Sequence, residues 1–139
     1  MADVSVTAAN VAPILTGSNP TQIENGIFGA TVTAGQLVYL DTTTNTYKLC
    51  DANASALTSV LRGVALNGGV SGQPAAVGVG GTYTCGFTAT AGAIYVASVT
   101  AGGIAPTTDL GAGVYTSILG VALTTAIMQL RIINSGVTG

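Results

Sequence analysis

The chain has 139 residues, which is long enough for one domain with a substantial hydrophobic core. Only 6% of the residues are charged and 48% are hydrophobic, which excludes a disordered chain, because such chains combine low hydrophobicity with high charge. Three Lys or Arg residues and a formal net charge of −2 exclude a nucleic-acid interface, because binding to a phosphate backbone requires several cations on one face.

The start of the chain carries no targeting or membrane signal. Met1–Val4 contains no basic residue and no apolar run, so we expect no secretory signal peptide. A membrane-spanning helix requires roughly 20 mostly apolar residues in a row, and small or polar residues interrupt every apolar stretch. We therefore expect no membrane association and no export. A surface with so little charge gives a free monomer little protection against association, so we also expect partner proteins to cover much of it.

Residues 1–28 form an N-terminal segment of their own in the prediction. A strand signal at Val4-Ser5-Val6 precedes a polar, turn-rich stretch from Thr16 to Gly26. Such a segment is either a loop over the domain's own surface or an arm that adds a strand to a neighbouring molecule. The low charge of Val4–Val11 favours the arm.

Residues 29–139 form a β domain in the prediction, a compact all-β barrel or sandwich with at most one short helix. Short runs rich in Val, Ile, Thr and Tyr alternate with Gly, Asn and Asp clusters, as is typical of such folds. The helix candidate is Asp51–Arg62, with Asp51 or Asn53 as its cap. The predicted strands are Asp3–Thr7, Gly29–Thr33, Leu37–Asp41, Tyr47–Asp51, Gly63–Leu66, Pro74–Val79, Thr82–Phe87, Ile94–Ala97, Ile118–Leu123 and Met128–Ile133.

An internal repeat is the most informative pattern in the β domain. Thr33-Ala34-Gly35 recurs as Thr90-Ala91-Gly92, and Gly63-Val64-Ala65-Leu66 recurs as Gly120-Val121-Ala122-Leu123, both at an offset of 57 residues. A repeat predicts two similar β modules, at about residues 29–89 and 90–139, that pack together. The alternative is coincidence in a sequence dominated by Ala, Gly, Thr and Val.

The residues that usually carry catalysis are scarce. The chain has no His, so the commonest general base and triad member is absent. Asp41 and Asp51 are the nearest carboxylate pair in sequence, but they flank a predicted hairpin, where Asp is a common turn residue. With Asn45 they do not follow the spacing of a calcium-binding EF-hand. We therefore predict no enzymatic activity, no cofactor and no metal site.

Two cysteines and one glycine-rich stretch support the same conclusion. Without an export signal, we expect Cys50 and Cys85 to be free, buried thiols; a disulfide between them is the alternative. Two Cys without any His cannot complete a four-ligand zinc site within one chain. Gly78–Gly81 precedes a predicted strand, whereas a phosphate-binding loop requires the N-terminus of a helix.

The sequence resembles small structural proteins of tailed bacteriophages, the head decoration or cement proteins. The similarity covers nearly the whole chain and consists of glycine and turn patterns without a catalytic signature. The segments that carry it are Met1-Ala2-Asp3-Val4-Ser5-Val6-Thr7-Ala8-Ala9-Asn10-Val11, Thr33-Ala34-Gly35-Gln36-Leu37-Val38-Tyr39-Leu40-Asp41, Arg62-Gly63-Val64-Ala65-Leu66-Asn67-Gly68-Gly69, Gly72-Gln73-Pro74 and Gly102-Gly103-Ile104-Ala105-Pro106.

The resemblance implies a β-rich protein bound to the outside of a phage capsid, commonly as a homotrimer that bridges neighbouring capsomers. Its partner would be the major capsid protein, its location the exterior of the virion, and its place of assembly the host cytoplasm. It would stabilise the expanded shell against the pressure of the packaged DNA.

We expect the contacts with the shell at two places, the N-terminal segment with Val4, Val6 and Val11, and the loop from Asn67 to Gln73. The main alternative function is a tail, fibre or receptor-binding component, which would also use Thr- and Gly-rich β structure. A small β-barrel enzyme is a third class, and it would require a pocket that contains two of the five carboxylates.

Overall fold

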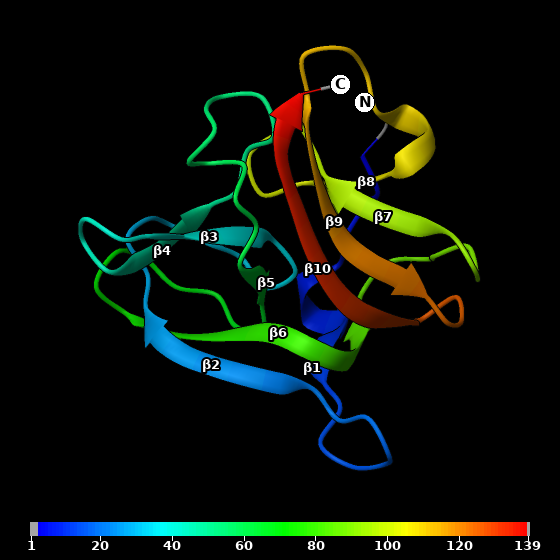
Figure 1. The fold of residues 1–139 in the computed structure, drawn as a ribbon. Coiled ribbons are helices and arrows are strands. Elements are labelled where there is room, and N and C mark those ends of the chain that lie inside the picture. The colour runs from blue at the N-terminus through cyan, green and yellow to red at the C-terminus, as the bar shows by residue number, and fades with distance from the viewer. Residues whose placement is uncertain (1–2, 139) are drawn as a thin grey trace.

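The computed structural model describes residues 3–138 and is all-β, as predicted (Figure 1). Met1, Ala2 and Gly139, at the ends of the predicted ranges 1–28 and 29–139, lie outside the described residues. None of the helices in the described part is long and apolar enough to cross a membrane. The elements are η1 (Ala8–Asn10), β1 (Val11–Pro13), β2 (Gln22–Ile27), β3 (Leu37–Asp41), β4 (Thr46–Leu49), β5 (Gly63–Ala65), β6 (Pro74–Cys85), β7 (Ile94–Ala97), β8 (Ile104–Pro106), η2 (Thr107–Asp109), β9 (Tyr115–Ala122) and β10 (Ile127–Thr138).

Strand β6 joins the two halves of the molecule. The strand order is β4-β3-β5-β6-β10-β9-β7-β8, and β1 and β2 also pair with β6. The first part of β6 pairs with β2 and β5, and its last part pairs with β1 and β10. Between them lies Gly81, whose φ of 75° turns the chain and whose missing side chain admits the Pro20 carbonyl. The predicted strands Pro74–Val79 and Thr82–Phe87 are therefore one strand with a bend.

The first half of the molecule consists of β2, β3, β4, β5 and the first part of β6, and its sheet curls on itself. The residues after β2 close it: Phe28 forms a parallel bridge with Tyr47 of β4, and the Gly29 N–H donates to the Tyr47 carbonyl at 2.8 Å. Phe28 is fully buried in this half. Its small core consists of Phe28, Val32, Val38, Tyr47, Ala65, Ala75 and Val77.

The second half consists of the last part of β6 with β10, β9, β7 and β8, and the N-terminal segment lies along it. The Val4 N–H donates to the Ile104 carbonyl of β8 at 2.9 Å, and the Thr7 N–H donates to the Gly86 carbonyl at 2.8 Å. Strand β1 then pairs with β6. Of the two alternatives for residues 1–28, this arrangement corresponds to a segment on the domain's own surface.

The two halves have matching backbone hydrogen bonds at the offset of 57 residues. The Gly35 N–H donates to the Ala65 carbonyl at 2.8 Å, and the Gly92 N–H donates to the Ala122 carbonyl at 2.7 Å. The strand order reads the same from either end, because β3, β4, β5 and β6 correspond to β7, β8, β9 and β10. The segments that repeat in sequence thus occupy matching places in the sheet.

The predicted helix Asp51–Arg62 is wrong, since the segment forms turns. Ser and Thr side chains compete with helical hydrogen bonds by binding the nearby backbone, and here the Thr58 N–H donates to Ser55 Oγ at 3.2 Å. Leu57 of the expected apolar stripe is 51% exposed. The stripe therefore does not face the core over its whole length.

Several strand predictions also need correction. Asp3–Thr7 and Gly29–Thr33 are not strands, because each makes only scattered backbone pairs, such as the isolated bridge between Val32 and Gly69. Strand β2 lies mostly within the stretch from Thr16 to Gly26, which was predicted to form turns because it is polar. Strands β1 and β8 were not predicted either. All three are short or mostly exposed, so their strand structure comes from pairing with β6 and β7.

Candidate interaction surfaces

An ionic cluster lies between β2, β4 and the start of β5. Arg62 Nε donates to Glu24 Oε1 at 2.9 Å, a second guanidinium nitrogen contacts the other carboxylate oxygen, and the Tyr47 hydroxyl also donates to Glu24. The hydrogen bond from Arg62 lowers the pKa of Glu24, against an opposing effect of burial, and the Tyr47 hydroxyl adds to the lowering. Burial, and then Glu24, raises the pKa of Tyr47. Glu24 is thus held ionised and bound, which does not suit a general acid or base.

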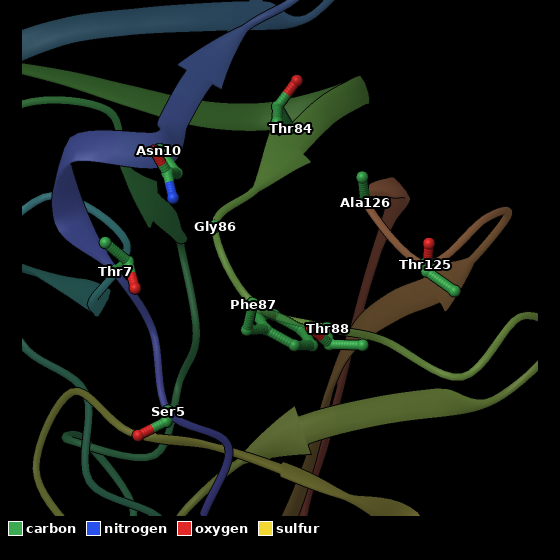
Figure 2. A pocket seen from close by; sticks show the side chains of 9 residues that line it. All are labelled: Ser5, Thr7, Asn10, Thr84, Gly86, Phe87, Thr88, Thr125 and Ala126. Carbon is green, nitrogen blue, oxygen red and sulfur yellow. The ribbon is translucent and has the colours of Figure 1, made fainter.

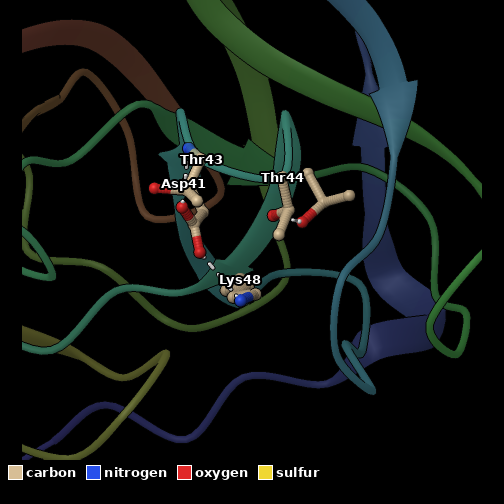
Figure 3. A network of polar contacts seen from close by, with 5 residues as sticks. Asp41, Thr43, Thr44 and Lys48 are labelled. Carbon is tan, nitrogen blue, oxygen red and sulfur yellow. Dashed lines mark hydrogen bonds and ion pairs between the residues drawn. The ribbon is translucent and has the colours of Figure 1, made fainter.

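The hairpin between β3 and β4 carries a second ion pair (Figure 3). Lys48 Nζ lies 2.8 Å from Asp41 Oδ2, and the Thr43 N–H donates to Asp41 Oδ1 at 3.0 Å. Lys48, and then the Thr43 N–H, lowers the pKa of Asp41. Asp51 Oδ1 instead accepts the Asn53 N–H at 3.2 Å. Asp41 and Asp51, the carboxylate pair considered from the sequence, therefore each bond within a separate turn.

Among the described side chains, the acidic residues lie apart from one another around the hollows that the structure shows. The hollow beside the ionic cluster, with a volume of about 260 Å³, contains Glu24 as its single carboxylate among Asn25, Leu40, Asn45 and other described residues. In the described part of the chain, no group of three or more His, Cys, Asp or Glu side chains is placed to hold a metal ion. The arrangement that would favour a small β-barrel enzyme is thus not found among these residues.

Cys50 and Cys85 are free and buried, as expected. Burial, with a smaller contribution from Asp51, raises the pKa of Cys50 to about 12. The Cys85 thiol donates to the carbonyls of Phe87 and Ala126, at 3.3 Å each. Both thiols serve as small core residues rather than as nucleophiles.

The three valines expected to contact a partner lie against the chain's own core. Val11 is 8% exposed and belongs to the large core, which contains residues of both halves, such as Leu37 and Leu119. Val4 and Val6 are half-buried and pack against the same core. In this conformation they hold the N-terminal segment to the domain and offer little surface to a neighbour.

The two polar residues expected to contact a partner shape their own loop. The Asn67 side chain accepts the Ala76 N–H at 2.8 Å and donates to the Pro74 carbonyl at 3.0 Å. Gln73 Oε1 accepts the Val70 N–H at 2.8 Å. Val70 itself is 50% exposed at the tip of this loop. The loop thus presents Val70 and the exposed Gln73, whereas Asn67 is half-buried.

Ten large apolar side chains of the described residues are exposed, and one of these, Val70, lies in a loop that the sequence prediction gave as a contact, from Asn67 to Gln73. No motif in the sequence distinguishes them from core residues. They are distributed over both halves and several loops: Leu15, Ile23, Ile27, Leu57, Val60, Val70, Ile94, Leu123, Ile133 and Val137.

A polar hollow of about 350 Å³ lies where η1, the end of β6 and the turn between β9 and β10 meet (Figure 2). Among the described residues, its lining is uncharged. Its lining comes from three distant parts of the chain, so no local motif announces it in the sequence. The residues are Ser5, Thr7, Asn10, Thr84, Gly86, Phe87, Thr88, Thr125 and Ala126.

Compared with models of known protein families and with curated proteins, the sequence gives no significant match. The resemblance to phage decoration proteins therefore rests on the residue patterns quoted above.

Proposed function

We propose that this protein is a structural virion protein that binds the outer surface of a phage capsid and stabilises the shell as a decoration, or cement, protein. The observation that carries the proposal is the surface, which combines eight charged residues in the whole chain with ten exposed large apolar side chains in the described part. Scarce charge and apolar side chains are typical of the central part of protein–protein interfaces.

Four of the eight charged residues already pair with one another within the chain. Lys48 pairs with Asp41, and Arg62 pairs with Glu24. Contacts with a shell would therefore consist mainly of apolar packing and backbone hydrogen bonds. Because the exposed apolar residues are dispersed, each contact is weak, and binding at many lattice sites sums them through multivalency. The proposed partners are the major capsid protein and further copies of this chain in a homotrimer.

The first test is the copy number of this chain in purified particles, measured by quantitative gel densitometry against the major shell protein. We expect a ratio near one or a simple fraction of it, since a decoration protein covers the lattice. A ratio of a few per cent or less would contradict the proposal and would support the alternative, a tail, fibre or receptor-binding component.

A second test uses shells from which the protein has been removed. Adding it back should raise the temperature at which the shells release DNA, and replacing exposed Leu57 and Val60 with Ser should reduce the amount bound. Ala91→Ser, a change of similar polarity at an exposed turn residue, is the matched control and should leave binding unchanged. If the wild type, the variant with Leu57 and Val60 replaced and Ala91→Ser all bound the shells equally, Leu57 and Val60 would not contribute to shell binding.

A further inference from the structure

The polar hollow is lined by side chains that have no hydrogen-bond partner in the described part of the chain. Six of them are uncharged and polar, and each carries a hydroxyl or an amide that both donates and accepts hydrogen bonds. In Figure 2, Asn10 and Thr125 lie on opposite sides of the hollow. The six are Ser5, Thr7, Asn10, Thr84, Thr88 and Thr125.

The backbone around the hollow is fixed by hydrogen bonds between the three segments that form it. The Thr7 N–H donates to the Gly86 carbonyl at 2.8 Å, and the Ala89 N–H donates to the Thr125 carbonyl at 2.9 Å. The Cys85 N–H donates to the Ala126 carbonyl at 3.0 Å. Since these bonds already order the three segments, a ligand in the hollow would not have to order them, which favours binding.

An aromatic ring completes the lining. Phe87 packs edge-on against Tyr95, with ring centroids 5.2 Å apart and an interplanar angle of 66°. The Tyr95 hydroxyl accepts the Thr90 N–H at 3.0 Å, which holds the pair in place. Phe87 is only 7% exposed and belongs to the large core, so it forms a fixed, buried side of the hollow, and the polar side chains supply most of the surface that a ligand could contact.

We propose that this hollow binds a neutral saccharide. Hydroxyl and amide side chains match the hydroxyls of a sugar, which also donate and accept, and the lining has no charge to attract an anion or a cation. A volume of about 350 Å³ lies at the small end of ligand sites and suits one or two sugar rings. The site is a function beyond shell binding and does not depend on it.

The test is a titration followed by amide chemical shifts in solution NMR. The probes are glucose, galactose, mannose, N-acetylglucosamine and the β1,4-linked disaccharides cellobiose, chitobiose and lactose, with glucuronate as the charged comparison. At least one neutral sugar should give saturable shifts centred on Gly86, Thr88 and Thr125, with a Kd on the order of millimolar, while glucuronate should bind more weakly.

Thr7→Val and Thr125→Val remove a hydroxyl while preserving side-chain shape. Each should weaken binding of that sugar roughly threefold to tenfold, the value of one hydrogen bond. Thr31→Val is the matched control, since Thr31 is exposed and outside the hollow, and it should bind like the wild type. Three results would overturn the proposal: no saturable shift with any probe up to about 100 mM, shifts that map elsewhere, or unchanged binding in both hollow variants.

Discussion

The two halves of the molecule have matching backbone hydrogen bonds but differ in the side-chain contacts that join their strands. In the first half, Glu24, Tyr47 and Arg62 connect β2, β4 and the start of β5, and Asp41 pairs with Lys48 across a hairpin. In the second half, Phe87 and Tyr95 form an edge-on pair within the larger apolar core, to which Leu37 and Val64 of the first half also contribute. The comparison shows that the same backbone arrangement can be stabilised by ion pairs in one half and by an aromatic pair in the other.

The largest effect is expected at the two matching glycines where strands approach most closely. A Cβ on Gly63 would clash with the Gly78 carbonyl, and a Cβ on Gly120 would clash with the Gln129 carbonyl. Because backbone atoms cannot swing away, Gly63→Ala and Gly120→Ala should each lower the free energy of unfolding by about 3 kcal/mol or more, measured by urea denaturation.

Gly111→Ala is the control for this pair, since nothing lies within 4 Å of its added Cβ. It should change stability by less than about 0.5 kcal/mol. If either Gly63→Ala or Gly120→Ala were as stable as Gly111→Ala, the close approach of the neighbouring backbone at that glycine would be wrong, and the two halves would differ there.

The second effect concerns pH and should distinguish the halves. The pKa of Glu24 is lower in the folded chain than its usual value of 4.5, so its contribution to stability is present above that value and is lost as the pH falls through the folded-state pKa. Glu24→Gln should cost about 1 kcal/mol at pH 7 and flatten the decline in stability below pH 4.5, in urea titrations at pH 7 and pH 3.

Asp51→Asn is the matched control, because Asp51 accepts a backbone N–H in a turn, a bond that an Asn side chain keeps. Its stability should decline with acid as that of the wild type does. A Glu24→Gln variant with an unchanged acid profile would mean that the ionic cluster does not stabilise the first half.

The third effect, similar in size to the second, concerns two tyrosines of the second half. The Tyr83 hydroxyl is fully buried and has no hydrogen-bond partner among the described residues, so Tyr83→Phe should raise the free energy of unfolding by about 1 kcal/mol. Tyr95→Phe should lower it by a similar amount, because the Tyr95 hydroxyl accepts the Thr90 N–H. Thermal unfolding of both variants measures the difference, and effects of the same sign would contradict it.

Sequence patterns predicted the parts of the fold that depend on local residues. Leu37–Asp41 and Ile94–Ala97 were predicted with the bounds that the structure has, because each is a compact apolar run after a turn. The bend at Gly81 was missed, since it depends on the approach of Pro20 from a distant segment. Residues 22–26 were predicted as part of a turn-rich stretch because that stretch is polar, whereas β2 exists through pairing with β6 and keeps most of its side chains exposed.

The candidate surfaces were less accessible to prediction than the fold. Val11 was expected to contact a partner because it lies in a low-charge segment, but burial depends on where that segment folds back. The hollow brings together Ser5, Thr84 and Thr125, which no spacing rule connects. Scarcity of charge was the one property of the surface that composition alone revealed.

The shared strand β6 also sets an order for folding during synthesis. When β6 has left the ribosome, β2 to β5 are already present, so the first half has all its strands before the second half begins. The last part of β6, residues 81–84, can pair with β10 only after β10 has also been synthesised. Until β10 emerges, that part of β6 has an unpaired edge, and a nascent chain paused there would be the form most exposed to strand exchange with another copy.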